Sequence, residues 1–83
     1  MTLLEARELP LMGRPESWNG CGKKRLELCP DGVLKQARHF FARLANEAPN
    51  PRAKEQVVAI DLVLEERAAH DPQQALEFFG GRA

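Results

Sequence analysis

The chain has 83 residues, of which 43% are hydrophobic and 29% are charged. This balance is typical of a small soluble globular domain and argues against an intrinsically disordered chain. Basic and acidic residues number 12 each, so the formal net charge at pH 7 is zero. No general positive field therefore draws the chain to nucleic acid or anionic lipid. We expect a single domain spanning residues 1–83.

The N-terminal residues and the cysteine count both favour the cytoplasm. Glu5, Arg7 and Glu8 stand where a secretory signal peptide would need an apolar core. No apolar run approaches the roughly 18 residues that a membrane-spanning helix requires. Cys21 and Cys29 are too few for a disulfide framework, and a reducing compartment would keep them as thiols.

A short helix is predicted at the N-terminus. Thr2 and Glu5 have the spacing of a capping box, in which each side chain bonds the backbone N–H of the other residue. Pro10 cannot continue this helix, and it pushes Leu9 toward an extended conformation. We therefore expect one or two turns, whose leucines need another element to cover them.

Residues 13–31 are predicted to form an irregular loop, because glycines and prolines interrupt them closely. Within it, residues 24–29 alternate at period two, which would place Leu26 and Leu28 on one face of a short β-strand. The same run also fits one helical turn, since it is too short to decide. Trp18, the only tryptophan, is predicted either to plug the edge of the core or to anchor an interface.

The strongest pattern in the sequence predicts a helix at about 32–48. Its apolar residues recur with the period of an amphipathic helix. We expect the core to receive Val33, Leu34, Ala37, Phe40, Phe41, Leu44, Ala45 and Ala48. The opposite, solvated face carries the basic side chains Lys35, Arg38, His39 and Arg43.

A second long helix is predicted at 51–70, with Asn50 as its cap and Pro51 at its first position. Its main apolar stripe is predicted to comprise Ala53, Val57, Ile60, Leu64 and Ala68. A second strip lies on another side of the helix and consists of Val58, Leu62 and Ala69. A helix that is apolar on two sides needs two neighbours. One of them is the preceding helix, because a short link favours antiparallel packing. The other is the N-terminal segment, the last helix or another protomer.

The predicted fold class is therefore all-α. We expect a small helical bundle built on an antiparallel helical hairpin, with helices at about 32–48 and 51–70, and with short flanking helices. If the short β-strand at residues 24–29 forms, it lies within the irregular loop at 13–31. A last short helix is predicted from Pro72 to Phe79, with Phe78 pointing away from Phe79.

No catalytic or metal centre is predicted. Cys21, Cys29, His39 and His70 are the ligand types of a zinc site, but their spacing differs from the usual zinc knuckle. Ser17 and the two cysteines have no base beside them in the sequence. We therefore predict a protein that is not an enzyme and that needs no cofactor or metal.

The preferred hypothesis is a small interaction or regulatory protein that binds another protein. Exposed apolar surface marks binding or oligomer faces. The candidate interaction residues are Trp18, Val58, Leu62 and Phe78. The alternative is that the leucines of the N-terminal segment cover the strip around Leu62. The sequence does not name the partner, and a homodimer is one candidate.

The second hypothesis is nucleic-acid binding through a basic patch. Its candidate residues are Lys23, Lys24, Arg25, Lys35, Arg38, His39 and Arg43. These side chains could contact phosphates if the loop folds back onto the helix. A solvated helix face explains them equally simply, and the zero net charge favours that interpretation.

Overall fold

A computed structural model describes residues 1–70. Its elements in chain order are α1 (Leu3–Glu8), α2 (Ser17–Gly20), the 3₁₀ helix η1 (Leu26–Leu28), α3 (Asp31–Glu47) and α4 (Pro51–His70). The all-α class predicted from the sequence is confirmed, and the described part of the chain contains no strand. The helix predicted from Pro72 to Phe79 lies outside the described residues.

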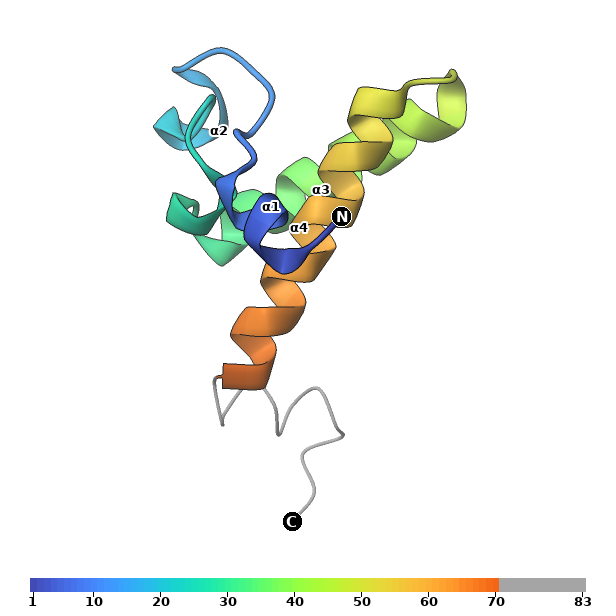
Figure 1. The fold of residues 1–83 in the computed structure, drawn as a ribbon. Helices are drawn as coiled ribbons and strands as arrows, with labels where there is room; N and C mark the ends of the chain where they lie inside the picture. The colour runs from blue at the N-terminus through green and yellow to red at the C-terminus, as the bar shows by residue number, and fades with distance from the viewer. Residues whose placement is uncertain (71–83) are drawn as a thin grey trace, which may run out of the picture.

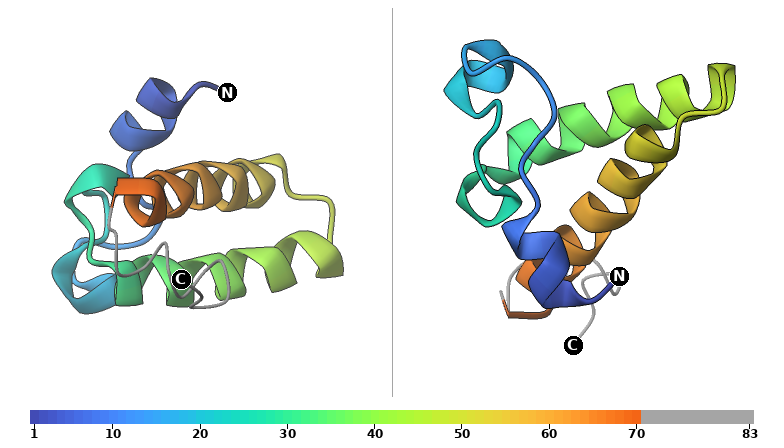
Figure 2. Two further views of the ribbon diagram at one scale, coloured as in Figure 1. Left: turned by 90° about the horizontal axis from the view of Figure 1, so that it is seen from below. Right: turned by 45° about the horizontal axis from the view of Figure 1, so that its top comes forward.

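The two long helices meet at the turn that joins them and spread apart from it like the arms of a V (Figures 1 and 2). α1 lies against α4 near the open end of this arrangement, and the loop that carries α2 and η1 lies near the start of α3. α1 also contacts η1. The N-terminal segment is therefore a second neighbour of α4, but it does not cover the predicted second strip, in which Val58 and Ala69 are exposed and Leu62 is half-buried.

The capping box predicted for α1 is formed. The hydroxyl of Thr2 accepts a hydrogen bond from the Glu5 N–H at 3.2 Å, and the Glu5 carboxylate accepts one from the Thr2 N–H at 2.8 Å. The bond from the Thr2 N–H is the main cause that lowers the pKa of the Glu5 carboxyl. The helix ends before Pro10, where Leu9 has the extended conformation that a following proline imposes.

The short β-strand that the sequence allowed at residues 24–29 does not form. Residues Leu26–Leu28 instead make a 3₁₀ turn that buries Leu26 completely and leaves Leu28 57% exposed, so the two leucines do not share a face. The only strand-like pairing in residues 1–70 is an isolated antiparallel bridge between Pro10 and Arg25. Its two flanking hydrogen bonds run from the Leu26 N–H to the Leu9 carbonyl at 3.0 Å and from the Leu11 N–H to the Lys24 carbonyl at 2.8 Å.

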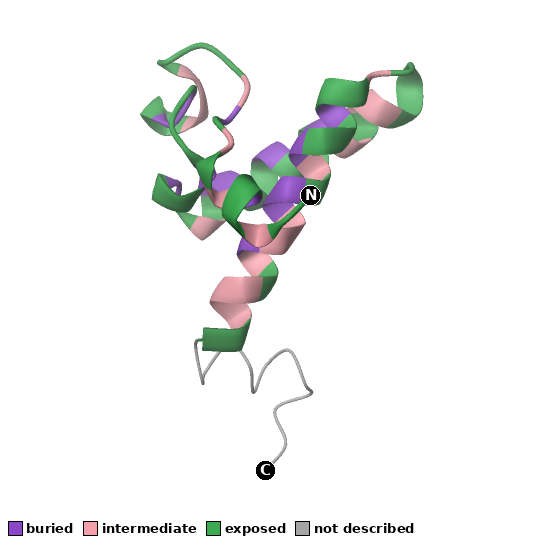
Figure 3. Cartoon of the chain, in the orientation of Figure 1, coloured by how far each residue is buried: buried purple, intermediate pink, exposed green. Residues whose placement is uncertain are grey.

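The residues of the hydrophobic core come from the two long helices, α1 and the segment between α1 and α3. Figure 3 marks the buried residues in purple. On α3 the predicted residues Val33, Leu34, Ala37 and Phe41 are buried. The prediction for Phe40 is wrong, because its side chain is 53% exposed. Phe40 lies about 100° around the helix from Phe41, and this turns it away from α4.

The buried face of α4 is rotated relative to the predicted stripe. It consists of Ala53, Gln56, Ala59, Ile60 and Val63. Of the predicted stripe, Ala53 and Ile60 are buried, whereas Val57, Leu64 and Ala68 are half-buried. The rotation has a physical reason, because α4 packs against α1 and η1 as well as α3. Its buried face therefore points between these neighbours rather than at one of them.

Candidate functional site

An open groove lies between the loop around α2 and one side of α3, with a volume of about 720 Å³. This volume falls within the range of about 300–1,000 Å³ that is typical of ligand pockets. The residues that line it are Met12, Gly13, Ser17, Trp18, Phe40, Phe41, Leu44 and Arg52. Most of them are apolar, so the groove is suited to apolar side chains rather than to a charged small molecule.

Three aromatic rings form the wall of the groove. The Trp18 ring centroid lies 5.8 Å from that of Phe40 and 5.9 Å from that of Phe41. Phe40 and Phe41 are 5.4 Å apart, with their planes at 79°. Inclined arrangements of this kind match the quadrupoles of the rings and stabilise each pair by about 0.5–1.5 kcal/mol beyond surface burial. The exposed ring of Phe40 is therefore held in place rather than free in solvent.

The indole of Trp18 is fixed by a hydrogen bond and by the backbone. Its Nε1–H donates to the Met12 carbonyl at 2.9 Å, which satisfies the only polar atom of the side chain. The backbone of Trp18 is left-handed, with φ 56° and ψ 43°, and Asn19 follows it with φ 57°. A non-glycine residue in this region costs on the order of 1–3 kcal/mol, and such strain is concentrated at functional sites.

Two glycines are needed for the loop to hold this shape. A Cβ atom on Gly13 would lie 2.9 Å from the Trp18 Nε1, and φ at Gly13 is +136°. A Cβ atom on Gly22 would lie only 1.7 Å from the Arg14 carbonyl oxygen. The sequence shows these glycines as ordinary loop punctuation. Their close approach to other segments is visible only in the structure.

Gln56 ties the other edge of the groove to α4. Its side chain is only 2% exposed and bonds the backbone of the N-terminal segment twice. The amide nitrogen donates to the Pro10 carbonyl at 3.0 Å, and the amide oxygen accepts from the Met12 N–H at 3.2 Å. Sequence reasoning missed this residue. The available signal was its position between Ala53 and Ile60, on the side of the helix that both share.

Arg52 is the one cationic residue among those that line the groove. It forms no ion pair or side-chain hydrogen bond with any of residues 1–70. A guanidinium beside an apolar wall can bind a carboxylate with two parallel hydrogen bonds. The groove therefore combines an apolar surface with one cation that is available to a ligand.

The predicted interaction residues do not gather at one place. Trp18 lies in the groove. Val58 is 49% exposed on α4, and Leu62 is half-buried against the core. α1 packs on α4 beside this strip, and Arg7 donates to Glu66, one turn after Leu62. Phe78 lies outside the described residues.

The basic residues considered for nucleic-acid binding are partly engaged by carboxylates of the chain itself. Arg38 bonds both carboxylate oxygens of Asp61 on α4, one of them at 3.3 Å. The other arginines pair with neighbouring glutamates, Arg25 with Glu27 at 3.4 Å and Arg43 with Glu47 at 4.0 Å. The remaining members of the set are exposed and unpaired within residues 1–70, and they are Lys23, Lys24, Lys35 and His39.

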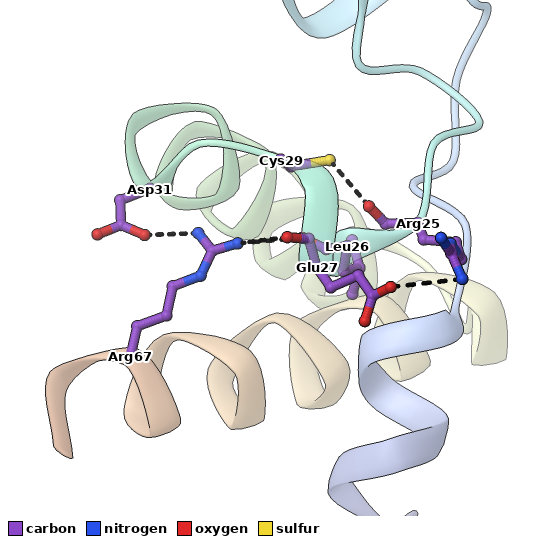
Figure 4. Close-up of polar contacts among 6 residues, drawn as sticks. All are labelled: Arg25, Leu26, Glu27, Cys29, Asp31 and Arg67. Atoms are coloured by element: carbon purple, nitrogen blue, oxygen red, sulfur yellow. Dashed lines mark hydrogen bonds and ion pairs between the residues drawn. The ribbon is translucent and has the colours of Figure 1, made fainter. Parts of the chain in front are cut away.

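The two cysteines are buried free thiols. The Cys29 thiol lies 3.5 Å from the Arg25 carbonyl oxygen, to which it donates (Figure 4), and 4.0 Å from that of Cys21. Burial, together with the neighbouring Cys21, raises the pKa of the Cys29 thiol to about 11. A thiol with this pKa is protonated at neutral pH and is neither a good nucleophile nor a ready metal ligand. No group of three or more potential metal ligands occurs within residues 1–70.

Comparison with protein-family models, with curated proteins and with solved structures gives no match. Within the described range, none of the helices has the length and apolar character needed to cross a membrane. The chemistry of the groove itself therefore carries the functional argument.

Proposed function

We propose that this chain is a non-catalytic binding protein whose groove receives an apolar segment of another protein. The observation that carries the proposal is the fixed aromatic wall formed by the half-buried Trp18 and the exposed Phe40. An exposed aromatic ring leaves apolar area in contact with water, and a partner that covers it gains about 25 cal/mol for each Å² removed from water. Because the rings are already held in place, little side-chain entropy is lost when the partner binds.

The groove also indicates what the partner should carry. One or two large apolar side chains would fill the space between Met12, Phe40 and Leu44. A carboxylate placed next to them would pair with Arg52, which has no partner in residues 1–70. A short amphipathic helix presents such a set at neighbouring positions and is a common ligand for apolar grooves. We therefore expect an acidic, apolar peptide segment.

The contacts favour this proposal over nucleic-acid binding. Three arginines of the basic set bind carboxylates of the chain, so a phosphate would have to compete with them. The aromatic wall, in contrast, has an exposed face that nothing in residues 1–70 covers.

Selection of peptides from a randomised library against the full-length chain tests the proposal. Selected peptides should share large apolar residues with a nearby aspartate or glutamate, and binding should change the fluorescence of Trp18, the only tryptophan. Phe40→Ala should weaken binding by about tenfold or more, as expected for an aromatic anchor. Arg52→Gln should cause a smaller loss.

Val58→Ala is the matched control, because Val58 is 49% exposed on α4 and Phe40 is 53% exposed on α3. Removing this side chain should leave peptide affinity unchanged. The proposal fails if the selected peptides lose affinity for Val58→Ala but bind Phe40→Ala as they bind the unmodified chain.

A further inference from the structure

The chain itself contains a segment with the chemistry that the groove selects. Residues 71–83 follow the described part, and they include Leu76, Phe78 and Phe79 around the acidic Glu77. We infer that the groove binds residues 74–79 of a second copy of this chain, and this inference rests on the proposed function. Each groove then receives the segment of the other copy, which gives a two-fold symmetric exchange.

Two features of the sequence make this segment a suitable occupant. Leu76 and Phe79 are three residues apart, so in the helix predicted from Pro72 to Phe79 they share one side. Together they supply the two large apolar groups that the wall of Phe40 and Trp18 can cover. Glu77 supplies the carboxylate for Arg52, the cation of the groove that is unpaired within residues 1–70.

The length of the chain argues that the segment comes from a second copy. Gln56 bonds Met12 of the groove, and His70 follows it by fourteen residues of the same helix. The end of α4 is therefore about 21 Å along the axis from the groove. A helix spacing of about 8–10 Å separates α4 from α3, whose side forms the wall.

An extended chain covers at most about 3.3–3.6 Å per residue. Leu76 comes six residues after His70 and therefore reaches about 20 Å, which falls short of its own groove. Phe79, nine residues after His70, reaches about 30 Å in an extended chain and could meet the groove, but an extended segment could not present Leu76 and Phe79 on one helical face. A helical segment over the same nine residues spans only about 14 Å and falls short of the groove. The segment of a second copy is not limited by the length of chain that links it to its own groove, because the second copy can take whatever position the interface requires.

Sedimentation of the full-length chain over a wide range of concentrations tests the inference. We expect a reversible dimer whose formation changes the Trp18 emission. Phe40→Glu, in the groove, and Phe79→Glu, in the segment, should each make the chain monomeric. An equimolar mixture of these two variants should dimerise again, because one intact groove then meets one intact segment. Circular dichroism checks that Phe40→Glu keeps its helices.

Leu28→Glu is the control and should leave the dimer intact, because Leu28 is 57% exposed on η1 and does not line the groove. Val58→Glu tests the other candidate face, on α4. A chain that stays monomeric at every concentration would overturn the inference, as would a dimer that is lost in Val58→Glu but kept in Phe79→Glu. A Trp18 signal that requires Phe79 but does not depend on concentration would show docking within one chain and would also overturn it. The peptide selection separates the two claims, because library peptides that still require Phe40 support the groove even where self-association fails.

Discussion

The two long helices are held in different ways. The buried face of α3 is entirely apolar, and its residues are Val33, Leu34, Ala37 and Phe41. The buried face of α4 includes Gln56, and the polar residues beside it bond other segments of the fold. Glu66 binds α1, Arg67 binds η1 and the start of α3, and Asp61 binds Arg38 of α3.

This difference explains where the groove lies. α4 packs against α1, η1 and α3, so its buried residues and the polar residues beside them contact three other elements. α3 packs mainly on α4, and within residues 1–70 its side around Phe40 contacts the short α2 loop. A helix with one principal neighbour keeps a side that is available for binding. A helix between several segments instead serves as the support on which the others are fixed.

The largest expected effects come from the apolar centre of each helix. Leu34 on α3 and Ile60 on α4 are both fully buried. Replacing either residue by alanine should lower the free energy of unfolding by about 2–5 kcal/mol, because the smaller side chain leaves a cavity. Urea denaturation measures the change. Val58→Ala, at an exposed site, should change it by less than about 0.5 kcal/mol. Equal effects at Ile60 and Val58 would contradict the assignment of the core.

The next effect concerns the polar residue in the core face of α4. Gln56→Leu keeps the apolar volume but leaves the Pro10 carbonyl and the Met12 N–H without their partner. A buried polar group without a partner costs about 1–3 kcal/mol, so we expect a loss of that size in urea denaturation. Gln36→Leu is the control, because Gln36 is exposed on α3. If Gln56→Leu is as stable as the unmodified chain, the two hydrogen bonds contribute nothing to the free energy of unfolding.

The comparison of the helices also shows what the sequence could predict. The all-α class followed from periodicity, and the capping box of α1 followed from the types and spacing of Thr2 and Glu5. Helix periodicity identified the buried face of α3, but it also assigned to the core Ala48, which follows the helix and is exposed, and the exposed Phe40. That residue lies at the edge of the apolar arc, where a small rotation decides between core and solvent. Periodicity alone does not fix such a rotation, because it depends on how the neighbouring segments pack.

The candidate site was less predictable than the fold. Trp18 was identified because a lone tryptophan in a loop must either be buried or bind something. Its partners Phe40 and Arg52 could not be assigned, since they come from different helices and meet the loop only after packing. The burial of Gln56 could not be predicted, because a pattern that places apolar residues in the core and polar residues at the surface assigns a glutamine to the surface. The residues that position the groove are thus those whose contacts are distant in the sequence.

A smaller effect is expected from the ion pair that joins α4 to the start of α3. Arg67 binds Asp31 at 2.6 Å and also donates to the Glu27 carbonyl at 3.1 Å and to the Leu26 carbonyl at 3.4 Å (Figure 4). Arg67→Met should therefore lower stability by about 1–2 kcal/mol, since the group is partly buried and makes several charge-assisted bonds.

Arg43→Met provides the matched measurement on α3. The side chain of Arg43 is 70% exposed and lies 4.0 Å from Glu47. Exposed pairs of this kind contribute about 0–1 kcal/mol, so thermal denaturation should show little change. A larger loss for Arg43→Met than for Arg67→Met would reverse the proposed contrast between the two helices.

The smallest effect should appear only as a dependence on pH. Arg7 donates hydrogen bonds to the Glu66 carboxylate and lowers its pKa below the ordinary value of 4.5. A carboxyl whose pKa is lowered by folding adds stability that is fully present above its unfolded pKa. This stability is lost as the pH falls through the lower pKa of the folded state. Denaturation of the unmodified chain and of Glu66→Gln should therefore differ at neutral pH and converge in acid.

Glu65→Gln is the control for this comparison, because Glu65 is the exposed neighbour of Glu66 on the same helix. Its stability should follow that of the unmodified chain at every pH tested. The lower pKa can be measured directly from the NMR titration of the Glu66 carboxyl carbon. In Arg7→Gln the midpoint of that titration should rise, because the first cause of the shift is the bond from Arg7. An unchanged midpoint in that variant would show that α1 is not tied to α4 through this pair.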